Sequence, residues 1–252
     1  MQKYIHDSVV PFKDSKLSKK EQVANMFDRI AFRYDFMNRF LSGGIDVIWR
    51  RKAIKELAAI SPQIILDVAT GTGDVAIMMA KSLKPKRIIG IDISEGMLAL
   101  GRKKIATLAL DNLIELQNGD SEAINFPGET FDSITVAFGV RNFANLEKGL
   151  AEMLRVLRPG GKLVVLEFSK PKQWGFKKIY SFYMKIAAAG IGKWIAKNRE
   201  AYEYLNDSVN AFPEGNDFLA ILNKAGYKDA YLKKLTLGIS TIYCASKKEI
   251  NQ

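Results

Sequence analysis

An acid followed by closely spaced glycines is the most informative pattern in the sequence. Asp67 precedes Val-Ala-Thr and then Gly71-Thr-Gly73, between an apolar run and a helical pattern. Glycines at the carboxyl end of a strand let the backbone approach a ligand closely, at the edge where α/β sheets bind cofactors. We therefore expect Asp67, Gly71 and Gly73 to form part of a site for a nucleoside-containing cofactor.

This pattern leaves three interpretations open. Gly71-x-Gly73-x-x-Ala76 also satisfies the dinucleotide fingerprint, with Asp92 at the distance of a ribose-binding acid, and a tight turn without a ligand fits as well. Asp67 can face the ammonium group of a methionine moiety, whereas it would repel a pyrophosphate. This favours S-adenosylmethionine over a nicotinamide dinucleotide.

Two later segments supply groups suited to the rest of that cofactor. Asp92 ends the second apolar run and can accept hydrogen bonds from both ribose hydroxyls, and Met97 can lie against the adenine face. Asp120 and Ser121 follow the third run, where an acid or hydroxyl can accept a hydrogen bond from the adenine amino group. Ordinary structural roles, Asp92 near a helix start and Met97 in the core, stay open.

Short apolar runs that alternate with helical patterns must position these groups. Such alternation is typical of βαβ units, and we expect a doubly wound α/β fold with a mostly parallel, seven-stranded sheet whose last strand is antiparallel. The five expected parallel strands are 64–69, 87–92, 113–118, 131–138 and 162–168. The helices expected between them are 74–84, 95–107 and 144–157, the last closed by Arg-Pro-Gly-Gly at 158–161.

Helical patterns also cover 18–59 and 217–226, and a turn at Gly43-Gly44 interrupts the first of them. Two runs of alternating apolar and polar residues flank Leu237-Gly238 and predict an antiparallel strand pair. We expect one domain over 1–252. Its expected parts are a helical cap (1–60), a cofactor-binding core (61–169), a helical lid insertion (170–213) and a C-terminal helix with the strand pair (214–248).

Composition limits the cellular setting and the partners. The chain has 252 residues, one cysteine and a formal net charge of +11. Cys244 alone provides neither a disulfide framework nor a cysteine metal site, so we expect a cytoplasmic protein without a metal. We recognise no signal peptide, and no run reaches the roughly 20 apolar residues of a membrane span. The charge favours an anionic partner, which nucleic acid, acidic lipid or solvent ions would all satisfy.

A basic and aromatic segment indicates where such a partner binds. Residues 170–197 hold seven lysines and no acid. Lysines interleaved with aromatic rings suit an anionic membrane surface, so we expect peripheral contact with the inner face of the membrane. A solvated basic face over a buried aromatic stripe is the alternative.

Several blocks together resemble the ubiquinone/menaquinone biosynthesis C-methyltransferase family. They are MFDRIAFRYDFMNRFLSGG, WRRKA, LDVATGTGD, DISEGML, FGVRN, LRPGG, LEFSKP and YEYLNDSVNAFP. The resemblance implies the fold of the class I S-adenosylmethionine-dependent methyltransferases. It also implies methyl transfer to a ring carbon of a prenylated quinol, first demethylmenaquinol and otherwise a ubiquinone precursor.

By position, the resemblance implies cofactor contacts at Thr72, Asp92, Asp120-Ser121 and Ala137. Asp120-Ser121 stands where Asn-Ala is common in the family, Ala137 where serine is common and Ala189 where proline is common. At Ala137 a backbone contact is sufficient, so a side-chain role is not implied.

Arg141 and Asn142 follow the fourth expected strand and are our candidates for catalysis. Methylation of a quinol ring needs a group that favours the phenolate. Guanidinium stays protonated, so Arg141 would stabilise the developing oxyanion while Asn142 orients the hydroxyl; a structural ion pair is the alternative for Arg141. We expect His6 to lie in a mobile tail, and we assign no role to Tyr34 or Asp35.

A competing function is RNA methylation, which would use the same cofactor and the same positive charge. The sequence contains no recognisable appended RNA-binding module, so we expect no nucleic-acid partner. Whether the chain forms a homodimer stays open.

Overall fold

The computed structural model describes residues 4–170 and 199–249; within the first long helix the side chains of 33–38 and 40–42 are not described. The predictions for the basic and aromatic segment 170–197 therefore fall almost entirely outside the described residues. The same holds for Ala189 and for the side chains of Tyr34 and Asp35.

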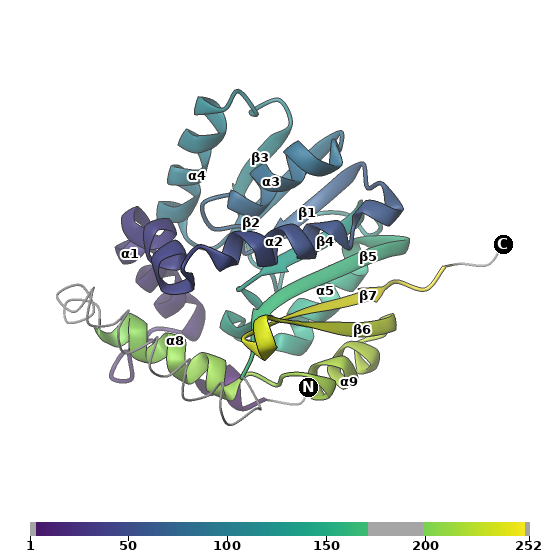
Figure 1. Ribbon diagram of the computed structural model, residues 1–252. Helices are drawn as coiled ribbons and strands as arrows, with labels where there is room; N and C mark the ends of the chain where they lie inside the picture. The colour runs from purple at the N-terminus through teal and green to yellow at the C-terminus, as the bar shows by residue number, and fades with distance from the viewer. Residues whose placement is uncertain (1–3, 171–198, 250–252) are drawn as a thin grey trace.

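A seven-stranded sheet in the order β3-β2-β1-β4-β5-β7-β6 forms the centre of the molecule (Figure 1). All neighbouring pairs are parallel except those of β7, which runs antiparallel to both β5 and β6. The predicted fold class is thus confirmed. The strands are β1 (Ile64–Val68), β2 (Arg87–Asp92), β3 (Ile114–Asn118), β4 (Phe131–Ala137), β5 (Leu157–Phe168), β6 (Lys228–Leu235) and β7 (Ser240–Ser246).

Helices cover both faces of the sheet because successive strand residues, which point to opposite faces, are apolar. Helices α2, α3 and α4 pack with Ile65 and Ile88 on one face, whereas α5 and α9 pack with Leu66 and Ile89 on the other. The described helices are α1 (Lys19–Ser42), α2 (Ile45–Lys55), α3 (Asp74–Leu83), α4 (Glu95–Thr107), α5 (Leu146–Val156), α8 (Arg199–Ala211) and α9 (Asn216–Lys224), with 3-10 turns η1 (Ile5–Ser8), η2 (Ala58–Ile60), η3 (Val140–Asn142) and η4 (Thr236–Gly238).

Strand β5 begins earlier than its apolar pattern predicts. Leu157 already pairs with Phe131 of β4, and the register then shifts before Ser133. Gly160 has φ of +74°, and its N–H donates to the carbonyl of Lys247. The segment 158–161 is therefore a bulge inside the strand pairing, where a glycine takes the left-handed conformation, rather than a loop before it.

The N-terminal segment is docked, so the expected mobile tail around His6 is wrong. The imidazole of His6 is fully buried and meets the ring of Phe212 edge-on at 5.6 Å. Lys19 donates from Nζ to the carbonyl oxygen of His6, at 2.5 Å. An aromatic partner distant in sequence and a buried cation thus hold the segment against α1 and the end of α8.

Candidate cofactor-binding site

A pocket of about 660 Å³, including its open mouth, lies at the carboxyl ends of β1, β2 and β4. The strand order reverses between β1 and β4, and α/β sheets bind ligands at this crossover. Sequence-predicted residues that line the pocket are Gly71, Asp92, Met97, Asp120, Ser121, Ala137 and Asn142.

The floor of the pocket is built from strained backbone. Ala69 and Phe138, just beyond β1 and β4, have φ of +54° and +58°, which is uncommon for residues with a Cβ atom. A Cβ at Gly139 would lie 2.5 Å from that of Ala69, so glycine is required for the close approach. Gly71 has φ of +57°, and no atom lies within 4 Å of the place where its Cβ would be. Its backbone is thus open to a ligand.

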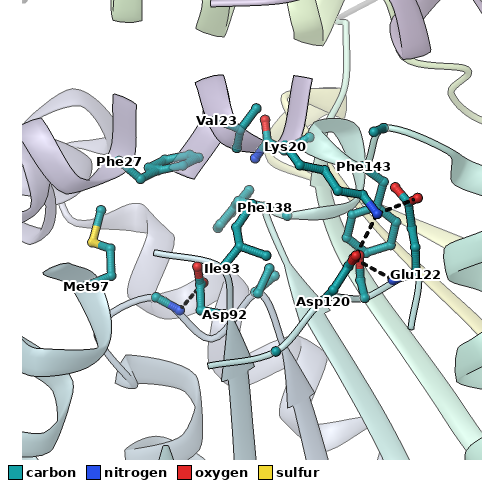
Figure 2. Close-up of a pocket in the computed structure, with 18 residues that line it drawn as sticks. Lys20, Val23, Phe27, Asp92, Ile93, Met97, Asp120, Glu122, Phe138 and Phe143 are labelled. Atoms are coloured by element: carbon teal, nitrogen blue, oxygen red, sulfur yellow. Dashed lines mark hydrogen bonds and ion pairs between the residues drawn. The ribbon is translucent and has the colours of Figure 1, made fainter. Parts of the chain in front are cut away.

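Asp92 is held in position by backbone donors. The N–H of Gly71 donates to Oδ2 at 2.8 Å and that of Ser94 donates to Oδ1 at 2.9 Å. Desolvation raises the pKa of the carboxyl, while these hydrogen bonds act in the opposite direction. The carboxylate lines the pocket at the end of β2 (Figure 2).

Apolar side chains make the two walls of a slot beside Asp92. Met97 from α4 and Ile93 lie on one side, and Val23 and Phe27 of α1 lie across from them (Figure 2). This slot has the chemistry expected for a flat aromatic base. Helix α1 is fixed over it because Oδ1 of Asp28 accepts hydrogen bonds from the α4 start, at Ser94 and Gly96.

The other end of the pocket is charged. The carboxylate of Asp120 follows β3 and pairs with the ammonium of Lys20, at 2.6 Å. Lys20 also pairs with Glu122, at 2.8 Å. Ser121 lines the pocket between the two acids.

Asp67, Thr72 and Gly73 lie behind the pocket lining. The hydroxyls of Thr70 and Thr135 donate to the two oxygens of Asp67, at 2.7 and 2.6 Å. Burial raises the pKa of Asp67 to about 6, against the effect of these hydroxyls. Oγ1 of Thr72 accepts from Lys104. In the described contacts, Asp67 and Thr72 therefore bond to other protein groups next to the turn at Gly71. Direct cofactor contacts of Asp67, Thr72 and Gly73 stay predictions.

Arg141 and Asn142 occupy different positions although they are adjacent in η3. Asn142 lines the pocket, and its Oδ1 accepts a hydrogen bond from Tyr204 of α8 at 3.1 Å. Arg141 is buried, with Nη1 2.8 Å from Oε1 of Glu167 and its guanidinium 5.4 Å from the Phe168 ring centroid. The structure thus contains the ion pair considered as the alternative for Arg141.

Sequence reasoning missed the α1 groups that line the pocket and the α8 tyrosine that hydrogen-bonds Asn142. Val23 and Phe27 show helical spacing, which predicts a helix but not what the helix covers. Lys20 and Tyr204 meet partners about 100 and 62 positions away in the chain. No local pattern gives such pairings.

Comparison with known proteins shows to which family the chain belongs. The model of the ubiE/COQ5 methyltransferase family matches residues 15–247. The chain belongs to the ubiE/COQ5 methyltransferase family. Two curated relatives are the demethylmenaquinone methyltransferase of Bacteroides fragilis, 44% identical over 97% of this chain and 99% of the relative, and the ubiquinone/menaquinone biosynthesis C-methyltransferase UbiE of Geobacter sulfurreducens, 47% identical over 91% and 90%.

Solved structures agree on the fold of this ubiE/COQ5 family member. A SAM-dependent methyltransferase of Thermotoga maritima matches with a TM-score of 0.61 at 20% identity, covering 89% of this chain and 99% of that one. The phosphoethanolamine N-methyltransferase 2 of Haemonchus contortus, in complex with S-adenosyl-L-methionine, matches with 0.65 at 15% identity, covering 94% and 62%. The predicted family, enzyme class and cofactor are confirmed: the protein is an S-adenosylmethionine-dependent methyltransferase.

Within the described residues, no helix is both long and apolar enough to cross a bilayer.

Proposed function

We propose that this protein methylates a ring carbon of a prenylated quinol, converting demethylmenaquinol to menaquinol. The observation that carries the proposal is a pocket lined by Gly71, Asp92 and Asp120 at the β1/β4 crossover in a chain of the ubiE/COQ5 family. Relatives named demethylmenaquinone methyltransferase favour the menaquinone branch. A ubiquinone precursor is the second candidate, because another relative carries both quinones in its name.

The pocket residues fit the cofactor. We assign the ribose hydroxyls to Asp92, the adenine face to Met97 and the adenine edge to Asp120 and Ser121. The open approach at Gly71 suits the methionine moiety, with Asp67, Thr72 and Gly73 supporting this turn and Ala137 contributing backbone on the opposite side. The assignments match each part of the cofactor to a group that suits it: carboxylate and hydroxyl acceptors to its donors, an apolar slot to its base and exposed backbone to its methionine moiety.

S-adenosylmethionine, when bound, supplies an electrophilic methyl group. The protein must place a ring carbon in line with it and favour the phenolate form of the quinol. Asn142 is the polar side chain on the pocket wall that we assign to the quinol hydroxyl, and Tyr204 fixes the orientation of its amide. The amide can then donate to the oxygen that gains negative charge.

Arg141 supports this task from behind the wall. Its ion pair with Glu167 fixes η3 and thereby Asn142, and its Nε has no hydrogen-bond partner among the described residues. We propose that the guanidinium adds positive potential to the oxyanion site. The paired Glu167 carboxylate offsets part of that potential, so the main role that we assign to Arg141 is to position η3 and Asn142.

We also propose that the protein meets its substrate at the cytoplasmic membrane surface. A prenylated quinol resides in the bilayer, and the net charge of +11 suits an anionic surface. The lysine-rich segment 170–197 remains the predicted contact.

Parallel assays with radiolabelled S-adenosylmethionine test the proposal and select the branch. The purified protein is offered reduced demethylmenaquinol, a demethylated ubiquinol precursor and total RNA in separate reactions. We expect label in demethylmenaquinol. Label in the ubiquinol precursor alone would move the assignment to the second candidate, and label only in RNA would refute a quinol substrate.

A further inference from the structure

Lys20 lies on α1 opposite the loop after β3, and its ammonium bridges two carboxylates at one end of the cofactor pocket (Figure 2). Both carboxylates are also held by backbone donors. The N–H of Glu122 donates to Oδ1 of Asp120 at 2.8 Å, and that of Asn145 donates to Oε1 of Glu122 at 2.8 Å. The two acids are therefore fixed within reach of one cation.

Two carboxylates that share an ammonium repel each other when it is removed. Burial lowers the pKa of Lys20, but the hydrogen bonds to Asp120 and Glu122 outweigh it, so the pKa is raised overall and Lys20 is cationic at neutral pH. Glu122 also interacts electrostatically with Lys19, which lies on α1 like Lys20. Loss of Lys20 would therefore act mainly on Asp120.

We infer that Lys20 is a specificity-determining residue for the adenine base. By pairing with Oδ2 of Asp120 at 2.6 Å it holds that carboxylate at the end of the pocket, where the carboxylate accepts a hydrogen bond from the exocyclic amino group. The inference rests on the proposed function, because it takes this pocket as the cofactor site. A carboxylate paired with an ammonium accepts hydrogen bonds, so it favours an amino group over a carbonyl oxygen in the same place.

Calorimetric titration with two nucleosides tests the inference without methyl transfer. The ligands are S-adenosylhomocysteine and its inosine analogue, in which a carbonyl oxygen replaces the amino group. We expect the wild type to prefer the adenine compound by at least about 30-fold, because a mismatched acceptor leaves buried polar groups unpaired. Lys20→Met should weaken adenine binding about 10-fold and change inosine binding less than about 2-fold, so the preference collapses.

Two further variants separate specificity from fold. Asp120→Asn should lower the preference by itself, because an amide can donate as well as accept, and adding Lys20→Met to it should change neither affinity further. Lys16→Met removes an equal charge from an exposed site near the start of α1 and should leave both affinities unchanged. If Lys20→Met does not fold, Asp120→Asn still decides whether the acid selects the base.

The outcomes are distinguishable. An equal loss of affinity for both ligands in Lys20→Met would show that Lys20 only fastens α1, and would overturn the inference. An unchanged preference in Lys20→Met or Asp120→Asn would overturn it as well. Failure of the wild type to bind either ligand would refute the proposed cofactor site itself.

Discussion

Replacing Arg141 by methionine should destabilise the protein strongly, because it leaves the buried carboxyl group of Glu167 without its ion-pair partner. The two side chains are 5% and 0% exposed, and their charged atoms are 2.8 Å apart. Removal of one partner from a buried ion pair costs about 3–5 kcal/mol, whereas neutralising both costs much less. We therefore expect Arg141→Met and Glu167→Gln each to lose about 3–5 kcal/mol, and the double variant to recover at least about 2 kcal/mol relative to their sum.

Urea unfolding followed by circular dichroism measures these free energies. Arg158→Met is the matched control, since it breaks a pair with Asp132 whose arginine side chain is 42% exposed, and it should cost no more than about 1 kcal/mol. A loss below about 1 kcal/mol for Arg141→Met, or additive effects in the double variant, would refute the reasoning. The ion pair would then not be what holds η3 and Asn142 in place.

Three other substitutions test the site and the fold. The pKa of His6 is lowered to about 3 by burial and by Lys19, so stability that His6 contributes as a neutral ring is lost as pH falls below about 6.5. The wild type should lose about 2 kcal/mol more than His6→Gln between pH 8 and pH 5 in urea unfolding, and parallel pH profiles would contradict this. Burial raises the pKa of Asp67 to about 6, and a cationic ligand favours the ionised form of this carboxyl group. The affinity for S-adenosylmethionine, measured by calorimetry, should therefore fall about 10-fold between neutral pH and pH 5. Asp67→Asn should remove this pH dependence. Asp92→Ala should weaken S-adenosylhomocysteine binding about 30-fold or more, and an unchanged dissociation constant would exclude Asp92 from the site.

The order of elements could be predicted because it depends on local pattern. Strand β2 and helix α4 match their predicted bounds. Apolar periodicity marks both elements, and the side chain of Ser94 caps the start of α4. Gly71, Asp92 and Asp120 also lie at one pocket as predicted, because parallel strands end at the same edge of the sheet. Asp92 and Gly71 are joined there by a hydrogen bond.

What could not be predicted depends on contacts between distant segments. His6 is buried because Phe212 meets it, and the extra length of β5 arises because Leu157 pairs with Phe131. The chain gives no local sign of either contact. Thr135 likewise donates to Asp67 from another strand, which places that acid behind the pocket lining rather than in it.

The position of methylation tests the central claim most directly. Purified protein, methyl-labelled S-adenosylmethionine and reduced demethylmenaquinol are incubated together, and the product is analysed by mass spectrometry and nuclear magnetic resonance. The account predicts one added methyl group, bonded to a quinone ring carbon, and slower transfer at limiting cofactor concentration when Asp92→Ala replaces the wild type. A methyl group on oxygen, or an unmodified quinol after the wild type has been shown to bind the cofactor, would contradict it.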